Sequence, residues 1–398
     1  MWLANVKIPI GPQHPALKEP ENFTITLDGE MVVDADIRIG YTHRGIEKLI
    51  ETRNYIQNLY LIERICGICS YTHTQNYVQN VENILNLQIP KRAEYIRTLF
   101  LELERLHSHL LWMGVAGHEI GFDTLFMYTW QDRELVQDIL EFISGNRVNY
   151  AMNTIGGVRR DISEDQKKKI LETMDYLEKR AAYYKDIAVN EKTILARCEG
   201  VGILKPEIAL KLTAVGPTAR ASGIDVDIRR DDPHAAYADT PFQVITTDTC
   251  DVFGRFVVRV LELVESITII RYLINNLPAG EIKVKAPRKV QEGEAISHTE
   301  APRGEDIHYL RSNGTDKPER YKVRTPTMAN LPSISEMLKG TYLADVPIIV
   351  AGIDPCMGCM DRVLILKEGK ENQPGFLLDW ERLRRYGIQW YAEKGGRA

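Results

Sequence analysis

The sequence predicts an α+β protein that has a mainly helical core, a long helix bundle, and β structure near both ends. From Arg44 to about residue 145, apolar residues recur at three- and four-residue steps, which is the period of an amphipathic helix. Apolar residues alternate with polar ones, as in strands, in residues 22–40 and again in residues 296–325. These observations place helices in the middle of the chain and strands toward its two ends.

The N-terminal strands are predicted from a hairpin pattern in residues 22–40. Phe23, Ile25 and Leu27 alternate with polar residues, and Asp28-Gly29 supplies the turn. A second apolar run follows that turn, so we expect two antiparallel strands.

Three long helices are expected in the middle of the chain. The first begins at Pro90 and carries a periodic apolar face: Ile96, Leu99, Leu103, Leu106 and Leu110. The second begins with a capping box of Ser163 and Gln166, and its face is Ile170, Met174, Leu177, Ala181 and Tyr184. The third spans residues 251–277, is apolar on most sides and is therefore expected to be central.

The C-terminal part changes character after residue 278. Residues 296–325 predict β structure with an Asn313-Gly314 turn, and a short helix is expected near residues 333–338. The apolar run 346–353 predicts a buried strand that leads to Asp354 and Cys356. For description, the chain divides into a β-hairpin region (1–43), a helical core (44–295), a β-rich segment (296–365) and a tail (366–398). No linker separates these parts, so one integrated domain is expected.

Composition excludes several classes of protein. The chain has 398 residues, of which 44% are hydrophobic and 26% charged, with a net charge of −5, all ordinary for a globular protein. Its basic residues are dispersed along the sequence, which argues against a nucleic-acid partner. No apolar run approaches the roughly 20 residues of a membrane-spanning helix, and no secretory signal is evident. Any association with a membrane is therefore expected to depend on partner subunits.

Four of the six cysteines form two Cys-x-x-Cys pairs near opposite ends of the chain, Cys66/Cys69 and Cys356/Cys359. Thiolates select nickel, zinc, copper(I) or iron–sulfur centres over magnesium or calcium. Zinc ribbons bring their two halves together across roughly 12–20 residues, whereas most of this chain separates the two pairs. The spacing favours a catalytic metal centre, with structural zinc, an iron–sulfur cluster or a redox dithiol as alternatives.

Two further residues have alternative interpretations. His73, four residues after Cys69, is either a core histidine or a hydrogen-bond donor to a metal-bound sulfur. Arg303 lies between Pro302 and Gly304, which suit a tight turn. It is either a surface arginine or a guanidinium directed inward at an anionic ligand.

Together these motifs resemble the large subunit of [NiFe] hydrogenases, most closely the membrane-bound, energy-converting group 4 enzymes (Ech/Mbh-like). The similar segments are ERICGICSYTH (residues 63–73), DPCMGCMDR (residues 354–362) and stretches between them, and the resemblance extends to about residue 365. GPQHP (residues 11–15) and YTHRGIEK (residues 41–48) are similar to the homologous 49-kDa quinone-site subunit of complex I. The complex I subunit lacks the four cysteines, so their presence here favours the resemblance to the hydrogenase over that to the quinone-site subunit.

The resemblance implies a role for each matching residue. Cys66 and Cys356 correspond to the terminal nickel ligands, and Cys69 and Cys359 to the ligands that bridge nickel to an iron carrying cyanide and carbon monoxide, a Ni-Fe(CN)2(CO) centre. Arg303 corresponds to the arginine over the open metal position, and Pro326-Thr327 to the segment whose hydroxyl binds a cyanide. His73 and Asp354 lie beside the cysteines. Cys356 is expected to accept the first proton, and Glu19 either relays it or is an exposed loop residue.

Two departures from the family pattern concern the C-terminal motif. Glu47 corresponds to a magnesium ligand of soluble relatives, but Arg362 stands where those relatives have the partner histidine. Because arginine does not bind metals, we expect a Glu47–Arg362 ion pair in place of magnesium. The chain also continues to Ala398, whereas many relatives are cut after that position once nickel is loaded. Either this branch is not cut, or the sequence is that of a precursor.

The resemblance also implies partners and activity. The two remaining cysteines, Cys198 and Cys250, are too few for an iron–sulfur cluster and are expected to be small buried residues. Electrons would therefore pass through a small subunit with a proximal [4Fe-4S] cluster and a further ferredoxin-like subunit, exchanging with ferredoxin. Antiporter-like, complex I-like membrane subunits would couple this to ion translocation at the cytoplasmic face of the membrane. The expected activity is reversible H2 evolution or oxidation. The alternatives are a hydrogenase-derived sulfur or polysulfide reductase and a quinone-type or zinc-holding scaffold subunit.

Overall fold

The structure, a computed structural model, describes residues 6–363 and 380–394. Its strands are β1 (Val6–Ile10), β2 (Asn22–Asp28), β3 (Met31–Arg38), β4 (Asn153–Thr154), β5 (Gly157–Val158), β6 (Gly293–Ala301), β7 (Gly304–Ser312) and β8 (Pro318–Arg324). Its α-helices are α1 (Ile46–Ile50), α2 (Tyr55–Glu63), α3 (Ser70–Leu85), α4 (Lys91–Glu119), α5 (Asp123–Ser144), α6 (Glu164–Asn190), α7 (Lys192–Cys198), α8 (Pro206–Lys211), α9 (Pro217–Arg220), α10 (Ile228–Asp231), α11 (Val252–Asn275), α12 (Pro326–Leu338), α13 (Val346–Gly352) and α14 (Trp380–Lys394). Short 3-10 helices, η1 (Tyr237–Asp239), η2 (Leu343–Asp345) and η3 (Met357–Cys359), complete the described elements. The predicted α+β class with a mainly helical core is confirmed.

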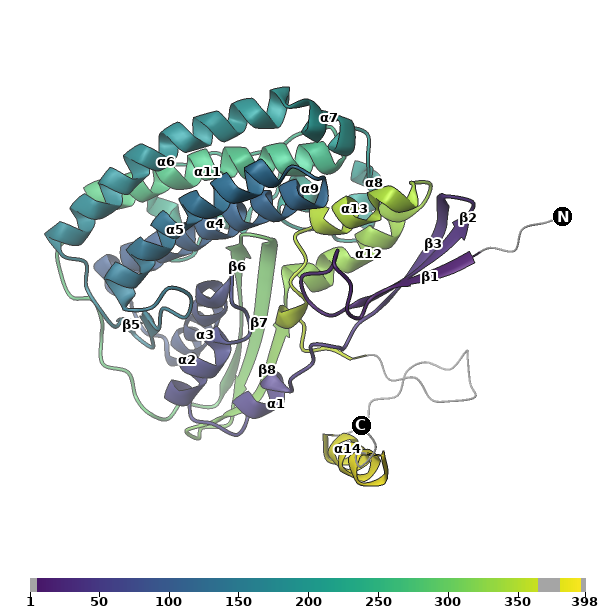
Figure 1. Ribbon diagram of the computed structural model, residues 1–398. Helices are drawn as coiled ribbons and strands as arrows, with labels where there is room; N and C mark the ends of the chain where they lie inside the picture. The colour runs from purple at the N-terminus through teal and green to yellow at the C-terminus, as the bar shows by residue number, and fades with distance from the viewer. Residues whose placement is uncertain (1–5, 364–379, 395–398) are drawn as a thin grey trace.

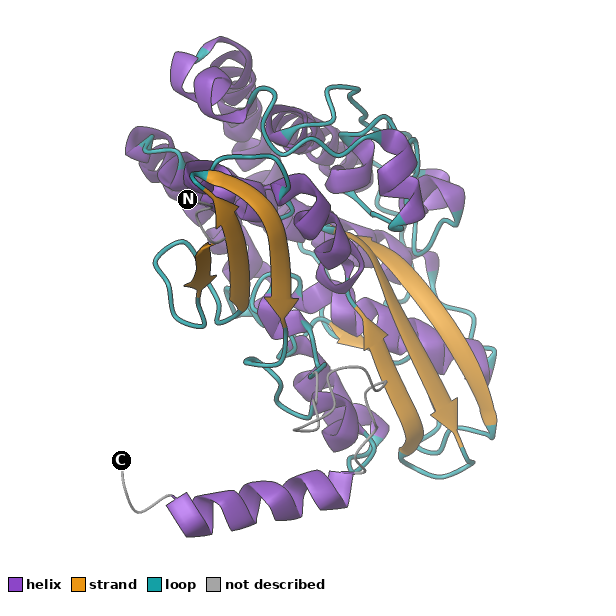
Figure 2. Cartoon of the chain, turned by 90° about the vertical axis from the view of Figure 1, so that its right-hand side faces the viewer, coloured by secondary structure: helices purple, strands orange, loops and turns teal. Residues whose placement is uncertain are grey.

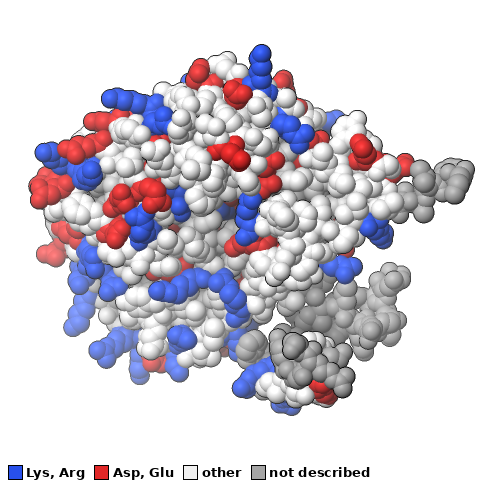
Figure 3. Space-filling view, viewed as in Figure 1, with Lys and Arg blue, Asp and Glu red and all other residues white. Residues whose placement is uncertain are grey.

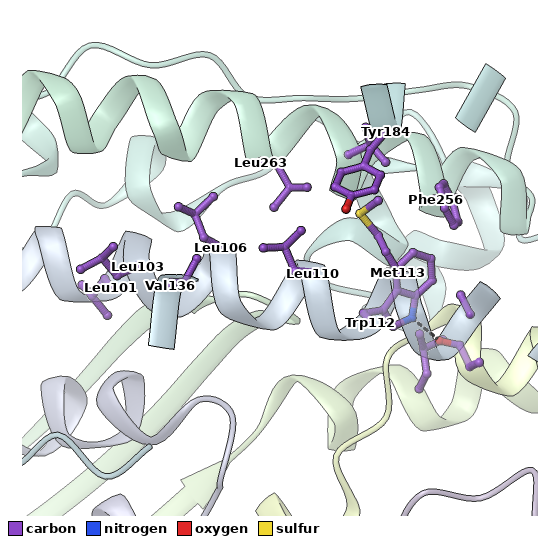
Figure 4. Packing of buried hydrophobic residues seen from close by; sticks show 14 of the residues in the cluster. Leu101, Leu103, Leu106, Leu110, Trp112, Met113, Val136, Tyr184, Phe256 and Leu263 are labelled. Atoms are coloured by element: carbon purple, nitrogen blue, oxygen red, sulfur yellow. Dashed lines mark hydrogen bonds between the residues drawn. The ribbon is translucent and has the colours of Figure 1, made fainter. Parts of the chain in front are cut away.

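The long helices α4, α5, α6 and α11 pack together along one side of the molecule (Figure 1). Leu106 and Leu110 of α4 lie opposite Leu263 of α11, and Trp112 packs against Phe256 with its indole N–H donating to the Ala351 carbonyl at 2.7 Å (Figure 4). The expected helix starts at Pro90 and Ser163 are both present, the latter with its capping box. The predicted central helix is α11, which contacts both α4 and α6.

The N-terminal sheet has the antiparallel order β1-β2-β3, and its strands are drawn in orange in Figure 2. The predicted hairpin is confirmed as β2 and β3, where Asp28 pairs with Met31 around the turn. The edge strand β1 was not predicted, because Pro9 interrupts its short apolar pattern and proline is tolerated in a sheet mainly at an edge. The sheet packs against α12.

The C-terminal sheet has the order β6-β7-β8, and α3 packs against β6 and β7. Ala301 pairs with Gly304, so Pro302 and Arg303 form the tip of the β6–β7 hairpin. Gly304 has φ 123°, and a Cβ there would lie 2.7 Å from the Gly216 nitrogen. This close approach of two backbones presses the hairpin tip into the protein and requires glycine at residue 304. The Asn313-Gly314 pair lies in the β7–β8 connection, as expected.

One element was predicted wrongly. Residues 346–353 were expected to form a buried strand, whereas the structure has the helix α13 from Val346 to Gly352. The segment is apolar and buried on nearly every side, and such a short run has no periodicity that distinguishes strand from helix. Pro347 lies in the first helical turn, where its missing N–H removes no intrahelical bond. The short helix expected near residues 333–338 is α12, which begins earlier, at Pro326, and contains Pro332.

Within the described ranges, no helix is long and apolar enough to cross a membrane. On the face shown in Figure 3, acidic and basic side chains intermix over the long helices, and basic ones predominate in the lower part. Of the tail, Phe376, Leu377, Leu378 and Asp379 lie outside the described residues, while Tyr386 and Trp390 are exposed on α14.

Candidate metal centre

The two Cys-x-x-Cys pairs meet in one buried cluster. Cys66 and Cys69 lie in the loop between α2 and α3, whereas Cys356 directly precedes η3 and Cys359 is its last residue. The Sγ atoms of Cys66 and Cys356 are 3.4 Å apart, those of Cys69 and Cys359 are 3.6 Å apart, and those of Cys356 and Cys359 are 2.8 Å apart. Each cysteine is at most 4% exposed. The shortest of these contacts exceeds the roughly 2.05 Å of a disulfide, and all four cysteines are free.

Burial and the neighbouring sulfurs shift the pKa values of the four thiols. Burial alone would raise the pKa of Cys66, but hydrogen bonds from Cys356, Cys359 and Cys69, together with the charge of Arg303, lower it well below its usual value. Against a hydrogen bond from Cys359, the Cys66 sulfur and burial raise the pKa values of Cys69 and Cys356 well above the usual value, and burial raises that of Cys359. Four buried sulfurs at one place are a ligand set that suits a soft divalent cation.

The start of α3 fixes the first cysteine pair. The N–H groups of Ile68 and Cys69 point at Cys66 Sγ from 3.2 and 3.1 Å. Cys69 is the N-cap of α3 but makes no side-chain cap. Glu104 of α4 supplies the cap instead, because its carboxylate accepts from the backbone N–H groups of Tyr71 and Thr72. Burial raises the pKa of Glu104 to about 7 despite these bonds.

Arg303 reaches the cluster from the tip of the β6–β7 hairpin. Its Nε donates to the Asp354 carbonyl at 2.7 Å, and its Nη2 donates to the Asp354 carboxylate at 2.8 Å. The side chain is 2% exposed, and its Nη1 is buried without a hydrogen-bond partner in the structure. Asp354 adopts φ 55°, an uncommon conformation for a residue other than glycine. Arg303 is therefore a buried, inward-directed guanidinium rather than a surface arginine.

Glu19 and Thr327 contact the second pair. A carboxylate oxygen of Glu19 accepts from the Gly358 N–H at 3.0 Å, and a Cβ on Gly358 would lie 2.8 Å from the other oxygen. Thr327, which follows Pro326 at the start of α12, accepts from the Cys356 N–H at 3.0 Å. This leaves the hydroxyl hydrogen of Thr327 able to donate. Glu19 therefore lies against the cysteine loop rather than in an exposed loop position.

His73 lies directly behind Cys69. Its Nε2 is 3.6 Å from Cys69 Sγ, and the whole side chain is buried. On its other side lie Asp306 and His308 of β7, which sequence reasoning did not single out. A signal was available, because these residues follow Arg303 by three and five positions and alternation in a strand puts them on one face. Glu104 was also missed, although it is an acidic residue on a mainly apolar helix.

The C-terminal motif is tied to the segment before α1. The Asp361 carboxylate accepts from the backbone N–H groups of Arg44, Gly45 and Glu47 at 3.2, 3.0 and 2.9 Å. The expected Glu47–Arg362 ion pair is present at 2.5 Å, and Lys322 binds the other Glu47 oxygen at 2.6 Å. Two cationic groups therefore occupy the carboxylate of Glu47, which leaves it poorly suited to a magnesium ion.

An apolar cavity of about 260 Å³ adjoins the cluster. Arg303, Asp354 and Met357 are among its lining residues, and Leu111, Trp112 and Val115 contribute apolar side chains from α4. Lys18 and Glu119, also on its lining, form an ion pair at 2.6 Å. A small apolar molecule could reach the guanidinium of Arg303 through this cavity.

The remaining cysteines lie apart from the cluster. Cys198 is fully buried, as expected. Cys250 is only partly buried and adopts φ 63°, so the expectation that both are buried was wrong for Cys250.

Comparisons with known proteins agree with this geometry. The model for the respiratory-chain NADH dehydrogenase 49 Kd subunit matches residues 119–291 and 284–362, and the model for nickel-dependent hydrogenase matches residues 44–114. The membrane-bound hydrogenase subunit alpha of Pyrococcus furiosus is 46% identical over 92% of this chain and 90% of that protein. Formate hydrogenlyase subunit 5 of Escherichia coli is 38% identical over 97% of this chain and 68% of that protein.

A solved structure is similar over nearly its whole length. A chain of the membrane-bound sulfane sulfur reductase, an archaeal respiratory membrane complex, superposes with a TM-score of 0.86 at 32% identity, covering 90% of this chain and 98% of that one. Identity and coverage of this extent mean that the chain belongs to the family of membrane-bound [NiFe]-hydrogenase large subunits that is homologous to the 49-kDa subunit of complex I.

Proposed function

We propose that the chain is the catalytic large subunit of a membrane-bound, energy-converting [NiFe] hydrogenase. The reaction is the reversible conversion of two protons and two electrons to H2. The observation that carries this proposal is the meeting of four buried thiols, drawn from both ends of the chain, in one cluster. The relatives with hydrogenase in their names and the nickel-dependent hydrogenase match over the first cysteine pair support it.

The residues present fit a Ni-Fe(CN)2(CO) group. Cys66 and Cys356 would be the terminal nickel ligands, and Cys69 and Cys359 the bridging ones, a pairing supported by the two cross-pair contacts of 3.4 and 3.6 Å. The unpartnered Nη1 of Arg303 and the free hydroxyl hydrogen of Thr327 offer donors to small anionic ligands of such a group. When bound, the group would supply the redox-active Lewis acid at which H2 is split heterolytically or formed.

Proton transfer is assigned to residues of the second pair. Cys356 Sγ would take up the proton, because its thiolate is a base beside the Gly358 loop that Glu19 contacts. Glu19 is the next acceptor, because its carboxylate rests against Gly358, between Cys356 and Cys359. Arg303 holds a fixed positive charge beside this path, anchored by Asp354. His73 donates to or accepts from Cys69, and Pro326 orients Thr327 at the helix start.

Electron transfer is assigned to other subunits. Once four thiols bind the metals, this chain retains only Cys198 and Cys250, too few for an iron–sulfur cluster. A small subunit with a proximal [4Fe-4S] cluster and a ferredoxin-like subunit would exchange electrons with ferredoxin. Complex I-like, antiporter-like membrane subunits would hold this chain at the cytoplasmic face and couple the reaction to ion translocation.

The test is metal quantitation and infrared spectroscopy of the purified complex. We expect nickel and iron near one each per chain, with the infrared bands of one carbon monoxide and two cyanides. One zinc per chain, without those bands or any H2-linked activity, would assign the cluster to a structural role instead.

A second candidate is a sulfur-reducing subunit that shares this scaffold. The similarity to the sulfane sulfur reductase chain favours it. The same measurement separates the two: a complex that contains no nickel and reduces polysulfide, but does not turn over H2, belongs to the second candidate.

A further inference from the structure

A buried polar seam lies behind Cys69, between α3 and the C-terminal sheet. It consists of His73, Asn76 and Asn80 on α3, Asp306 and His308 on β7, and Tyr321 on β8. The three α3 residues recur at steps of three and four, so they share one face of the helix, and residues 306 and 308 share one face of the strand. All six side chains are fully buried, so their polar groups depend on one another for partners.

Asp306 is the centre of this seam. Its Oδ2 lies 3.1 Å from His73 Nδ1, 3.0 Å from His308 Nε2 and 3.0 Å from Asn76 Nδ2. Asn76 Nδ2 also donates to the Asp306 carbonyl at 2.9 Å. One carboxylate oxygen therefore accepts from an amide and lies within 3.1 Å of a nitrogen of each imidazole ring. The two rings stack with their centroids 5.2 Å apart, and His73 Nδ1 is hydrogen-bonded to His308 Nε2 at 3.1 Å.

These contacts limit where the rings carry their hydrogens. A carboxylate oxygen is an acceptor, and His73 Nδ1 and His308 Nε2 also lie 3.1 Å from each other, so at least one of these two nitrogens carries a hydrogen. His308 Nδ1 is hydrogen-bonded to the Tyr321 hydroxyl. His73 has one remaining ring nitrogen, Nε2, and that nitrogen faces Cys69 Sγ at 3.6 Å.

We propose that Asp306 is a positioning residue, which holds the His73 ring so that Nε2 faces the sulfur of Cys69. Asp306 touches none of the four cysteines and acts only through His73. The inference rests on the proposed function, in which Cys69 would be one of the thiolate ligands of the metal group. A fixed imidazole at that sulfur would tune how much electron density the thiolate gives to the metals.

The decisive variant is Asp306→Asn in the purified complex. The side chain keeps its size, but it loses the negative charge that attracts both imidazole rings, and its NH2 group adds a donor among donors. We expect the carbon monoxide and cyanide bands to shift, because the imidazole that faces Cys69 Sγ is no longer held in place. Unshifted bands in metal-loaded Asp306→Asn would overturn the proposal.

Two control variants separate positioning from general damage. Asp132→Asn also removes a buried carboxylate, one that accepts from Arg180 and Tyr184 on α6, remote from the cysteines. It should lower thermal stability without shifting the bands. His308→Phe removes both nitrogens of the His308 ring but keeps the contact between Asp306 and His73. The infrared bands of this variant should therefore move less than those of Asp306→Asn. A His308→Phe shift as large as that of Asp306→Asn would assign the effect to the seam as a whole and contradict the proposal.

If the Asp306→Asn complex loses its metals, it has no infrared bands to compare, and a second measurement then tests the proposal. The structure of the Asp306→Asn complex, determined by cryo-electron microscopy, reports the His73 ring directly. We expect Nε2 to lie beyond hydrogen-bonding distance of Cys69 Sγ, and an unmoved ring would overturn the proposal. Failure of the proposed function is distinguishable, since it would show as absent nickel and absent bands in the wild-type complex.

Discussion

The helical core and the metal-centre end of this molecule are built by different means. In the core, Leu106, Leu110 and Leu263 lie at helical spacing and pack against their neighbours through apolar contact alone (Figure 4). At the metal centre, residues from both chain ends meet, and hydrogen bonds and ion pairs hold them, such as Asp361 on the start of α1. Local apolar packing therefore stabilises the core, whereas the metal centre also depends on single polar contacts between segments that are distant in the chain.

The largest expected effect comes from the cluster itself. Cys356→Ser should abolish H2 turnover and reduce bound nickel, because a hydroxyl is a harder, weaker ligand than a thiolate. Far-UV circular dichroism should remain that of the wild type, since the helices do not depend on this side chain.

The matched control is Cys250→Ser, which changes a partly buried cysteine outside the cluster. It should keep both nickel and turnover. If Cys250→Ser lost as much nickel and H2 turnover as Cys356→Ser, the effect would not be specific to the cysteine cluster.

The converse substitution is Leu106→Ala, which creates a cavity in the core. It should cost about 2–5 kcal/mol in the free energy of unfolding, measured by urea denaturation, while the infrared bands of the assembled complex stay unshifted. Leu210→Ala, at a residue that is 63% exposed, should cost less than about 0.5 kcal/mol. A band shift in Leu106→Ala would show that core packing and metal geometry are coupled.

Asp361→Asn tests the polar attachment of the C-terminal motif. The carboxylate accepts from three backbone N–H groups, and weakening such charged hydrogen bonds should cost about 1–3 kcal/mol. We expect nickel to be lost faster to a chelator than from Leu106→Ala, even where the core variant is the less stable of the two. The reverse order of nickel loss would count against the attachment role.

The smallest effect concerns pH and a histidine at the surface of the C-terminal sheet. Hydrogen bonds to Glu305 and Asp232, at 2.9 and 2.6 Å, raise the pKa of His298 to about 9, against the opposing effect of burial. A raised folded-state pKa stabilises the folded protein fully below the unfolded value near 6.5, and this contribution is lost as the pH rises through about 9.

The measurement is the urea midpoint between pH 6 and pH 10. In the wild type, the urea midpoint should decline as the pH approaches 9, and His298→Gln should flatten that decline. The control is His118→Gln, at an exposed histidine, which should keep the wild-type decline. An unchanged pH profile in His298→Gln would show that another group titrates there.

The same contrast explains what could be predicted from the sequence. Helical periodicity and capping residues gave α4, α6 and α11, because their determinants are local. The helix α13 was mistaken for a strand, and β1 was missed, because only tertiary packing decides a short apolar run and an edge strand containing Pro9. At the metal centre, the four cysteines and Arg303 were singled out from their spacing and neighbours, and the resemblance supplied the roles proposed for them. Asp306 and Glu104 were not singled out, since their importance arises from contacts between segments more than 30 residues apart along the chain.

The distance along the chain between the two cysteine pairs has a consequence for biosynthesis. Because 290 residues separate Cys66 from Cys356, the ribosome needs roughly 15 to 60 s at 5–20 residues per second to produce the second thiol pair after the first. Throughout that interval the nascent polypeptide carries half of a soft-metal ligand set with nothing to complete it. A cell that makes this chain must shield those early thiols from stray zinc and oxidants until translation ends.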